Sequence, residues 1–291
     1  MRRLAAACAV ALTAAVAACS SPKPAASPNP TRYLGVAGVS TAGLRGFEQA
    51  TGIRPGIVEI YTTFGDPLKS ARLTAIIRGG AKPLVQLEPY HVSLSTIAAG
   101  RYDAYLRRYA AGLSRLGHQI LLSFAPEANG YWYNWGCRST SAAAFVAAWR
   151  HVHDIIARYD RRIIWLWDVN QSFPGSCPIT ARWPGGGYVD WVGVDGYLWY
   201  PYLTFNMVFA PTIVNLRLFT GKPILIAETG VLNMPQAAAQ LKGIFAGAKA
   251  IPGVIGVVYS DYATAQHDYR LEKDRPALAT FRREAKDYAT R

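Results

Sequence analysis

The sequence has few cysteines, few acidic residues and no long run of one charge, and each shortage excludes a class of protein. Four Cys in 291 residues are too few for a small disulfide-stapled domain. With 26 Gly and 18 Pro the chain is not low in complexity, and 51% hydrophobic residues are too many for a disordered one. Lys and Arg outnumber Asp and Glu by 31 to 18, but they are scattered. Without a basic arm or run, we expect no nucleic-acid partner.

The first 31 residues have the composition of an export signal and a linker. A positive start, Met1-Arg2-Arg3, precedes an apolar stretch from Leu4 to Val16 that is too short to span a bilayer. Residues 16–19, Val-Ala-Ala-Cys, resemble the lipobox of bacterial lipoproteins; an ordinary signal peptide cleaved after Ala-x-Ala is the alternative. We expect a signal peptide over residues 1–18, lipidation of Cys19 and a Ser-, Pro- and Ala-rich linker over residues 19–31.

These expectations predict an exported protein that is held on the outer face of the bacterial cell membrane through its N-terminal lipid alone. The net charge of +13 fits this setting, because anionic headgroups and wall polymers attract cations. Export also bears on the cysteines, since Cys8 leaves with the signal and Cys19 takes the lipid. The remaining pair, Cys137 and Cys177, is predicted to form a disulfide between two loops. Two free buried thiols are the alternative.

From Tyr33 onward the chain alternates between short apolar runs and helical patterns. Most runs are continuously apolar, as in parallel strands that are covered on both faces. The expected strands are residues 33–39, 57–62, 83–88, 119–125, 162–168, 191–195, 223–228 and 254–260. The expected helices include residues 102–116, 142–159, 205–220, 236–250 and 276–288. Eight strand-then-helix units predict a single (β/α)8 TIM barrel over residues 32–291. A doubly wound open sheet is the competing fold, but no Gly-x-Gly-x-x-Gly follows the first strand.

Polar residues gather where the expected strands end, which is where a TIM barrel carries its chemistry. A carboxylate at the end of an apolar strand is unfavourable unless it is paired or used. Several strands that end in a carboxylate indicate one shared acidic site at the mouth of the barrel, where the strands end. Any one of these carboxylates could instead cap the next helix. Aromatic residues follow in the loops, and flat aromatic faces beside acids are typical of a sugar-binding cleft. The acids and aromatics are Glu88, Glu127, Asp168, Asp195, Glu228, Asp261, Tyr131, Trp132, Tyr133, Trp135, Tyr197, Trp199, Tyr200 and Tyr202.

Four segments that contain many of these residues resemble, in the same order along the chain, segments of glycoside hydrolase family 26, which is typified by β-mannanases. Residues 122–136, LSFAPEANGYWYNWG, resemble the family's acid/base segment, and residues 222–230, KPILIAETG, resemble its nucleophile strand. Residues 145–170 and 184–197 resemble the family's fifth strand with its preceding helix and the entry to its sixth strand. The resemblance covers most of residues 33–262. It implies a retaining glycosidase on a TIM barrel.

The resemblance also implies roles for single residues. Glu127 matches the general acid/base and Glu228 the nucleophile of a double displacement, which needs two carboxyl groups roughly 5–5.5 Å apart. Tyr197 matches a tyrosine that keeps the nucleophile ionised. The match and the positions at strand ends together give these candidate substrate-binding residues: Glu88, His91, Asn129, Trp132, Trp135, Asp168, Asn170, Tyr197, Trp199 and Tyr259. We expect no metal or other cofactor, because His151 and His153 lie two apart on a helix with no ligand spacing beside them.

Three positions depart from the family's pattern. Pro126 stands where the family usually has His, Ser123 stands where we expect Arg, and Tyr259 and Tyr262 are the nearest candidates for its Trp after strand eight. The polysaccharide therefore stays open between a mannan, a glucan, a xylan and a glycan of the cell envelope. We expect a monomeric retaining endo-glycosidase. The alternative is a non-catalytic carbohydrate-binding or envelope lipoprotein on a degenerate barrel. A solute-binding lipoprotein would need two lobes and a hinge, which the uninterrupted units argue against.

Overall fold

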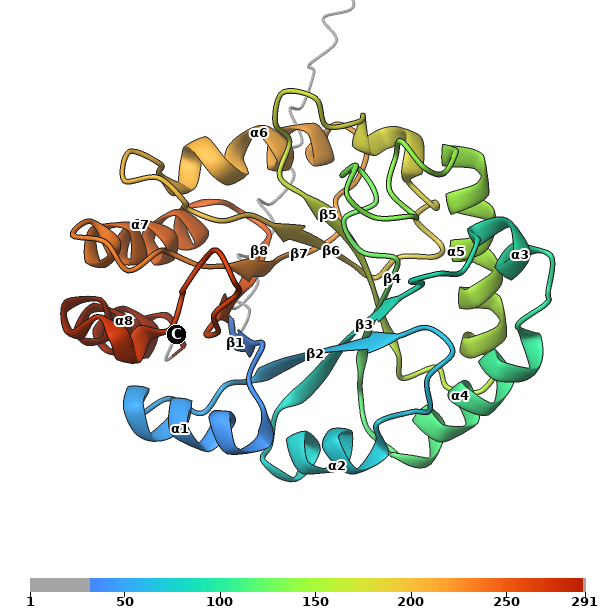
Figure 1. Cartoon of the computed structure of the whole chain (residues 1–291), viewed down its shortest axis with the longest axis horizontal. Coiled ribbons are helices and arrows are strands. Elements are labelled where there is room, and N and C mark those ends of the chain that lie inside the picture. The colour runs from blue at the N-terminus through green and yellow to red at the C-terminus, as the bar shows by residue number, and fades with distance from the viewer. Residues whose placement is uncertain (1–31, 290–291) are drawn as a thin grey trace, which may run out of the picture. The chain divides into compact units, whose positions relative to one another are not determined.

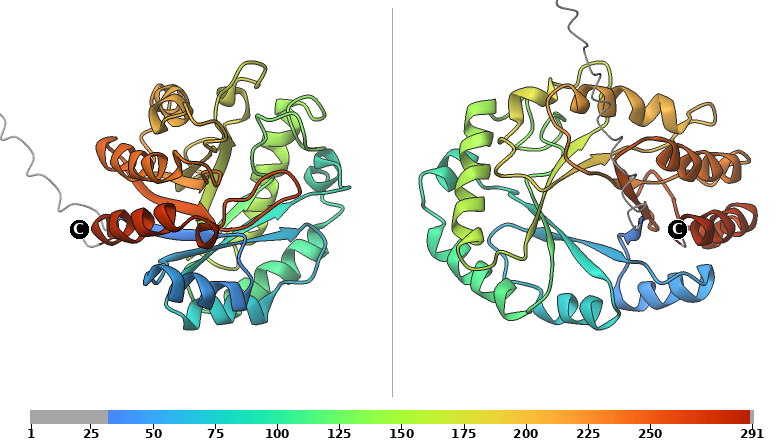
Figure 2. Two further views of the ribbon diagram at one scale, coloured as in Figure 1. Left: turned by 60° about the vertical axis from the view of Figure 1, so that its left-hand side comes forward. Right: turned by 180° about the vertical axis from the view of Figure 1, so that it is seen from behind.

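The computed structural model describes residues 32–289. The predictions for the signal peptide, Cys8, Cys19 and the linker lie outside the described residues. Eight parallel strands close into a barrel in which each strand pairs with the next and β8 pairs with β1. The helices ring the strands, as the front and rear views show (Figures 1 and 2). The closed parallel barrel confirms the predicted TIM-barrel fold.

The observed strands follow the expected ones closely. They are β1 (Tyr33–Ala37), β2 (Ile57–Thr63), β3 (Lys82–Glu88), β4 (Leu121–Phe124), β5 (Ile164–Asn170), β6 (Trp191–Asp195), β7 (Ile224–Thr229) and β8 (Val254–Ser260). The helices are α1 (Thr41–Thr51), α2 (Ser70–Arg78), α3 (Leu94–Ala98), α4 (Asp103–Arg115), α5 (Ala142–Ala157), α6 (Phe205–Arg217), α7 (Ala237–Ala250) and α8 (Arg275–Ala289). Two short 3-10 helices, η1 (Ile179–Arg182) and η2 (Leu271–Lys273), complete the described elements.

One connection departs from the predicted eightfold repeat. Between β5 and β6 the described chain forms η1 in place of an α-helix. This segment contains Pro174, Pro178 and Pro184 and a run of three glycines at residues 185–187. Proline cannot donate the helical hydrogen bond and glycine loses the most conformational freedom in a helix, so this composition favours a loop. The result is a long loop at the C-terminal ends of the strands, and it contains Cys177.

The barrel interior changes from apolar to polar along the strands. Successive residues of a strand face opposite sides, so the inward-facing set advances in steps of two. Inward-facing residues form a small buried apolar cluster, which lies in the first halves of β2 to β5 and extends along β1, β7 and β8: Ala37, Ile57, Leu84, Leu121, Leu166, Leu225, Ala227 and Val258. Two residues further along, four of these strands place Glu59, Gln86, Ser123 and Asp168, all of them buried. A polar layer therefore lies on an apolar base, below the C-terminal ends of the strands.

The barrel forms one compact unit. The unit spans Thr31–Arg291, closes its own sheet and contains its own hydrophobic core between strands and helices. This part of the chain therefore folds on its own. Within residues 32–289, the helices are too short or too polar to cross a bilayer.

Candidate active site

Glu127 reaches the mouth of the barrel through an unusual turn after β4. Its φ of 51° and the φ of 50° at Ala125 lie in the left-handed region, which residues other than glycine rarely adopt. The backbone N–H of Glu127 donates to the carbonyl oxygen of Asp168 at 3.1 Å, which ties the turn to β5. Backbone strain of this kind persists where surrounding contacts hold it, and it clusters at functional sites.

Glu228 enters the same mouth through an irregularity in β7. The pairing of β7 with β6 shifts so that Asp195 aligns with Glu228, and the pairing with β8 shifts between Ile226 and Thr229. In a regular strand, Ala227 and Glu228 would face opposite sides of the wall. Here Ala227 belongs to the interior apolar cluster, while the Glu228 carboxylate also bonds inside the barrel. The register shift thus lets two consecutive residues face inward.

Both carboxylate oxygens of Glu228 accept a hydrogen bond from a tyrosine. The Tyr61 hydroxyl donates to Oε1 at 2.8 Å, and the Tyr197 hydroxyl donates to Oε2. The hydroxyls of Ser260 and Tyr262 lie 3.0 and 3.3 Å from that of Tyr197 and extend the chain of polar contacts. Burial raises the pKa of Glu228, and the two tyrosine bonds oppose this rise. Burial and the charge of Glu228 raise the pKa values of Tyr61 and Tyr197, so both tyrosines stay protonated and can donate.

Glu127 has a different environment. The Asn170 side-chain amide donates to Oε1, and the Trp132 indole N–H donates to Oε2 at 3.2 Å. Burial, followed by the negative charge of Glu228, raises the pKa of Glu127 to about 7, although the bonds from Asn170 and Trp132 favour the ionised form. Glu127 follows β4 and Glu228 lies near the end of β7 in the same closed barrel, so the two carboxyls share one mouth. Two carboxyls in contrasting environments are what a pair of acid and nucleophile requires.

A buried polar layer supports these two glutamates from below. The Gln86 side-chain amide donates to Glu59 Oε1 and to Asp168 Oδ2, both at 2.7 Å. Burial raises the pKa values of Glu59, Asp168 and Asp195 well above the usual range, and neighbouring carboxylates raise them further. At Gly193 a Cβ atom would lie 2.4 Å from Asp168 Oδ1, so glycine leaves the space that this carboxyl fills. Burial in this layer therefore favours the neutral form of these carboxyls.

Exposed aromatic rings flank the two glutamates. Trp132 is 43% exposed and stacks on Phe173 with ring centroids 6.1 Å apart. Trp199 is 39% exposed, lies nearly parallel to Tyr197 at 6.0 Å, and donates to the Tyr269 hydroxyl at 2.8 Å. Flat, fixed and partly exposed rings of this kind suit the faces of pyranose sugars. The structure brings Trp132 and Trp199 to the site. Their contact with sugar stays a prediction.

The disulfide predicted between Cys137 and Cys177 is confirmed, with their Cα atoms 6.2 Å apart. Two backbone bonds accompany it, from the Cys137 N–H to the Gly130 carbonyl at 2.8 Å and from the Cys177 N–H to the Asn129 carbonyl at 3.1 Å. Trp132 belongs to the first of these loops, after β4, and Phe173 to the second, after β5. The disulfide therefore fixes the two loops whose rings stack beside Glu127.

Asn129 and Trp135, both predicted to bind substrate, lie inside the protein. Trp135 is fully buried and its indole N–H donates to the Pro126 carbonyl at 2.7 Å. Asn129 is 1% exposed and exchanges bonds of 2.8 and 2.9 Å with the backbone of Asn170. The prediction of direct sugar contact is therefore corrected for both residues. They brace the turn that presents Glu127.

Tyr259 and Asp168 also require correction as substrate contacts. Tyr259 is one residue from the inward-facing Val258, so it faces outward, where it packs on Phe281 with ring centroids 5.2 Å apart. Its hydroxyl donates to the backbone of Tyr269. Asp168 is 1% exposed and belongs to the buried polar layer. Neither side chain has surface available to a sugar.

Glu88, His91 and Asn170 lie at the ends of strands β3 and β5. Glu88 is 8% exposed, and burial followed by the charge of Glu228 raises its pKa to about 7. The Tyr90 hydroxyl lies 3.4 Å from its Oε1 atom. His91 is exposed and has a φ of 60°. Sugar contact by Glu88 and His91 stays a prediction, whereas Asn170 contacts Glu127 directly.

Three residues of the site were missed in the sequence. Tyr61 is the second-last residue of the strand expected over residues 57–62, where a tyrosine is as typical of packing as of function. Glu59 carried a signal, since it is a carboxylate in the middle of the apolar run of residues 57–60. Gln86 carried a weaker signal of the same kind in β3. Counting steps of two from Ile57 would have placed Glu59 and Tyr61 on the inner face.

Comparison with known proteins places the chain beside polysaccharide-degrading enzymes. Residues 56–242, more than half of the chain and including both glutamates, match the model of glycosyl hydrolase family 26. Endoglucanase H of Acetivibrio thermocellus is 28% identical over 204 residues, which cover 65% of this chain and 23% of that protein. A mannan endo-1,4-beta-mannosidase of Bacillus subtilis is 30% identical over 191 residues, covering 60% of this chain and 50% of that protein. The chain thus spans half or less of the length of these relatives.

The fold is also shared with solved structures. The modular endo-β-1,4-mannanase of Cellulomonas fimi superposes with a TM-score of 0.66 at 17% identity, covering 90% of this chain and 71% of that one. The catalytic domain of the family 26 endo-β-1,4-mannanase of Bacillus sp. JAMB-750 gives a TM-score of 0.68 at 15% identity, covering 89% and 86%. At these identities the likeness shows the barrel fold.

Proposed function

The chain belongs to glycosyl hydrolase family 26, and we propose that it is a retaining endo-glycosidase acting on a β-linked polysaccharide. The observation that carries the proposal is the contrast between two carboxyls in one mouth. The pKa of Glu127 is raised to about 7, so this carboxyl holds a proton at mildly acidic pH. Glu228 accepts two tyrosine hydrogen bonds, which stabilise its ionised form. These are the starting states of an acid and a nucleophile.

In the first step, Glu228 attacks the anomeric carbon while Glu127 protonates the leaving glycosidic oxygen. The proton is best placed on Oε2, because Asn170 holds Oε1 whereas the bond from Trp132 to Oε2 is longer and lies toward the open side. Bond formation removes the charge of Glu228 and yields a covalent glycosyl ester.

In the second step, the loss of that charge changes the role of Glu127. The charge of Glu228 raises the pKa of Glu127, so its removal lowers this pKa and makes Glu127 an ionised base. Glu127 then takes a proton from water, whose oxygen attacks the anomeric carbon. The bond from that carbon to the Glu228 oxygen breaks, and the sugar leaves with retained configuration. Tyr61 and Tyr197 stabilise the departing carboxylate through the same two bonds.

The substrate is proposed as a β-1,4-linked mannan or a β-glucan, which the activities named for the endoglucanase and mannosidase relatives support. Trp132 and Trp199 would supply the flat faces for sugars next to the cleaved bond. Ser123 and Pro126 offer little to the sugar under attack. The Ser123 hydroxyl is buried without a hydrogen-bond partner among the described residues, and the Pro126 carbonyl is occupied by Trp135. Hydroxyl recognition therefore falls to Glu88, Tyr90 and the glutamates themselves.

We also propose that Cys19 is lipidated and that it holds the enzyme, as a monomer, on the outer face of the cell membrane. The sequence of residues 16–19 and the Pro-rich stretch after it support this proposal. Mass spectrometry of the N-terminal peptide from a bacterial membrane fraction tests it. A peptide that begins at a diacylated Cys19 is expected, whereas an unmodified peptide cut elsewhere refutes it.

The test of activity is hydrolysis of mannan, mixed-linkage glucan and xylan by residues 31–291, with products resolved by size and anomeric configuration. Glu127→Gln and Glu228→Gln remove one carboxyl each with little change of shape, and Glu272→Gln on the exposed η2 is the matched control. One polymer should be cut with retention, with a loss of at least about a thousandfold in both site variants and none in the control.

An aryl glycoside with a good leaving group separates the two roles. Its first step needs no proton, so Glu127→Gln should accumulate the glycosyl-enzyme in a burst, while Glu228→Gln should not react. If the wild type is inert on every polymer but binds one of them, the alternative of a non-catalytic carbohydrate-binding lipoprotein is favoured instead.

A further inference from the structure

The two ends of the barrel carry opposite charge. Seven segments lead from the end of a helix into the next strand, at residues 52–56, 78–82, 115–120, 158–163, 183–190, 217–223 and 251–253. These ranges include Arg78, Arg115 and Arg217, which are the last residues of their helices, and Lys82, which is the first residue of β3. They contain nine Lys and Arg side chains against two Asp. The connections from a strand into the next helix contain four Lys and Arg against six Asp and Glu, in residues 38–40, 64–69, 89–93, 125–141, 171–178, 196–204, 230–236 and 261–274. By these counts the N-terminal ends of the strands carry a net charge of +7, whereas the loops at the C-terminal ends carry −2.

The cations at this end, which we name the basic face, are available to a partner. The basic face comprises Arg54, Arg78, Lys82, Arg115, Arg158, Arg161, Arg162, Arg217 and Lys222. Arg162 pairs with Asp160, and Arg217 bonds backbone carbonyls. In contrast, Arg78, Arg115 and Arg161 are exposed and form no ion pair with any described residue. Two apolar side chains stand among them, Leu218 at 79% exposed and Tyr159 at 42%.

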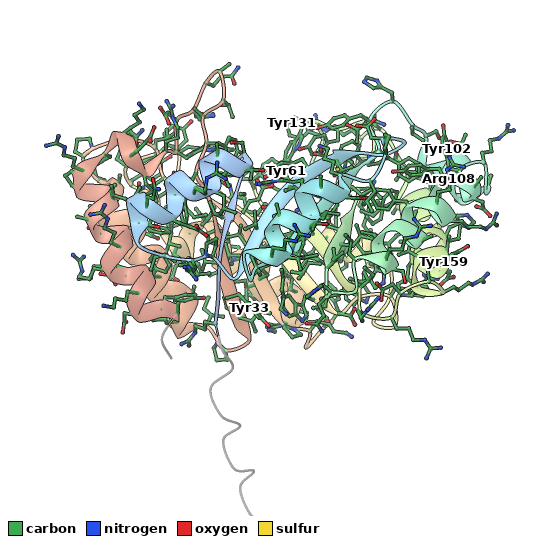
Figure 3. The ribbon with its side chains drawn as sticks, turned by 90° about the horizontal axis from the view of Figure 1, so that it is seen from below. Tyr33, Tyr61, Tyr102, Arg108, Tyr131 and Tyr159 are labelled. Carbon is green, nitrogen blue, oxygen red and sulfur yellow. A yellow bond between two sulfur atoms is a disulfide. The ribbon has the colours of Figure 1, made fainter. Side chains whose placement is uncertain are left out.

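The described part of the chain also begins on the side of the basic face. Tyr33, at the start of β1, and Tyr159 lie toward the lower side in Figure 3, whereas Tyr61 and Tyr131 of the site lie toward the upper side. Twelve residues lie between Cys19 and Arg32. Such a length spans at most about 45 Å, so a lipid on Cys19 would keep this face within reach of the bilayer.

We propose that the basic face docks on an anionic phospholipid bilayer and so orients the catalytic mouth away from the membrane. Basic residues close to an anionic surface gain from its negative potential, and Leu218 and Tyr159 suit the boundary between headgroups and acyl chains. The acidic mouth is repelled by the same potential, so both ends of the molecule favour one orientation. The docking is a property of the barrel and does not require the proposed lipid or the proposed hydrolysis.

The test measures sedimentation of residues 31–291 with vesicles. The vesicles contain phosphatidylcholine alone or with about 30% phosphatidylglycerol, an anionic lipid. The variant Arg78→Gln/Arg115→Gln/Arg161→Gln removes three unpaired cations from the basic face. The matched control Arg45→Gln/Arg101→Gln/Arg275→Gln removes three exposed arginines of α1, the α3–α4 connection and the start of α8, which form no ion pair with any described residue. Both variants have the same net charge.

Wild-type protein should bind the anionic vesicles and should not bind the neutral ones. Each basic residue near the surface strengthens binding about fivefold, so the basic-face variant should bind about a hundredfold more weakly, and the control should change by less than about fivefold. Equal losses in both variants would show that net charge alone drives binding and would overturn the proposal. Binding to a soluble polyanion but not to vesicles would overturn it too.

Two further measurements separate electrostatic docking from misfolding and from loss of catalysis. Raising the salt from about 0.05 M to about 0.3 M should release the wild type from anionic vesicles, which needs no variant at all. Hydrolysis of a soluble oligosaccharide should be equal in the wild type and both variants, because the altered arginines are remote from the mouth. A folded, active variant that loses vesicle binding isolates docking from catalysis; loss of hydrolysis in every protein would instead refute the proposed function.

Discussion

Replacing Glu228 by Gln should lower the pKa of Glu127, because it removes the negative charge that acts on it. Two unit charges about 5 Å apart, at an effective dielectric constant of about 20, interact by about 3 kcal/mol, which corresponds to about 2 pKa units. The rise from 4.5 to about 7 leaves room for this, and burial, the larger cause, persists in the variant. We expect the pKa of Glu127 to fall to between about 5 and 6.

Carbon-13 NMR of glutamate carboxyls is the suitable assay, since the inactive variant has no rate to follow. The chain contains seven glutamates, so the spectrum of selectively labelled protein is simple, and Glu127→Gln assigns the signal. Glu272→Gln, on the exposed η2, is the isosteric control and should leave the pKa of Glu127 unchanged. A change smaller than about 0.3 units in Glu228→Gln would mean that the carboxyls lie too far apart for a retaining mechanism.

Three further substitutions test the site and its supports. Tyr197→Phe removes one of the two hydrogen-bond donors to Glu228 and so raises the pKa of Glu228. We expect kcat/KM at about pH 6 to fall roughly tenfold and the acidic limb of the pH profile to move to higher pH. An unchanged profile would contradict this role of Tyr197. Cys137→Ala/Cys177→Ala opens a link between residues 40 positions apart and should lower the free energy of unfolding in urea by about 4 kcal/mol. Gly193→Ala forces a Cβ atom to within 2.4 Å of a buried carboxyl oxygen and should lower it by about 1–3 kcal/mol, whereas Gly186→Ala, with open space around it, should not.

The sequence was sufficient to predict the barrel because its strands are short, apolar and separated by helical patterns. The helices expected from the residue pattern include no α-helix between residues 168 and 191, as observed, although the eightfold repeat by itself would place one there. The proline and glycine content of residues 171–190 was the local signal against it. Strand ends were placed to within a few residues, which was enough to bring Glu127 and Glu228 to one mouth.

The errors within the site share one physical cause, which is the direction of each side chain. Trp135 and Tyr259 were chosen as aromatics near strand ends, but one is buried in its loop and the other faces the helices. Tyr61 was missed although it faces inward in β2. The inward direction of the Glu228 side chain follows from a register shift between β6 and β7, and the residues of β7 do not predict that shift. Residue type thus predicted the chemistry of the site more reliably than its contacts.

The polar layer of Glu59, Gln86, Asp168 and Asp195 sets a limit for protein engineering. Larger apolar side chains at these positions would continue the packing of the lower interior and could raise the melting temperature. They would also remove the hydrogen-bonded polar floor that lies below both catalytic carboxyls. A search for a more thermostable variant would therefore do better among the helices and surface loops, since stability gained in this layer would come with lost turnover.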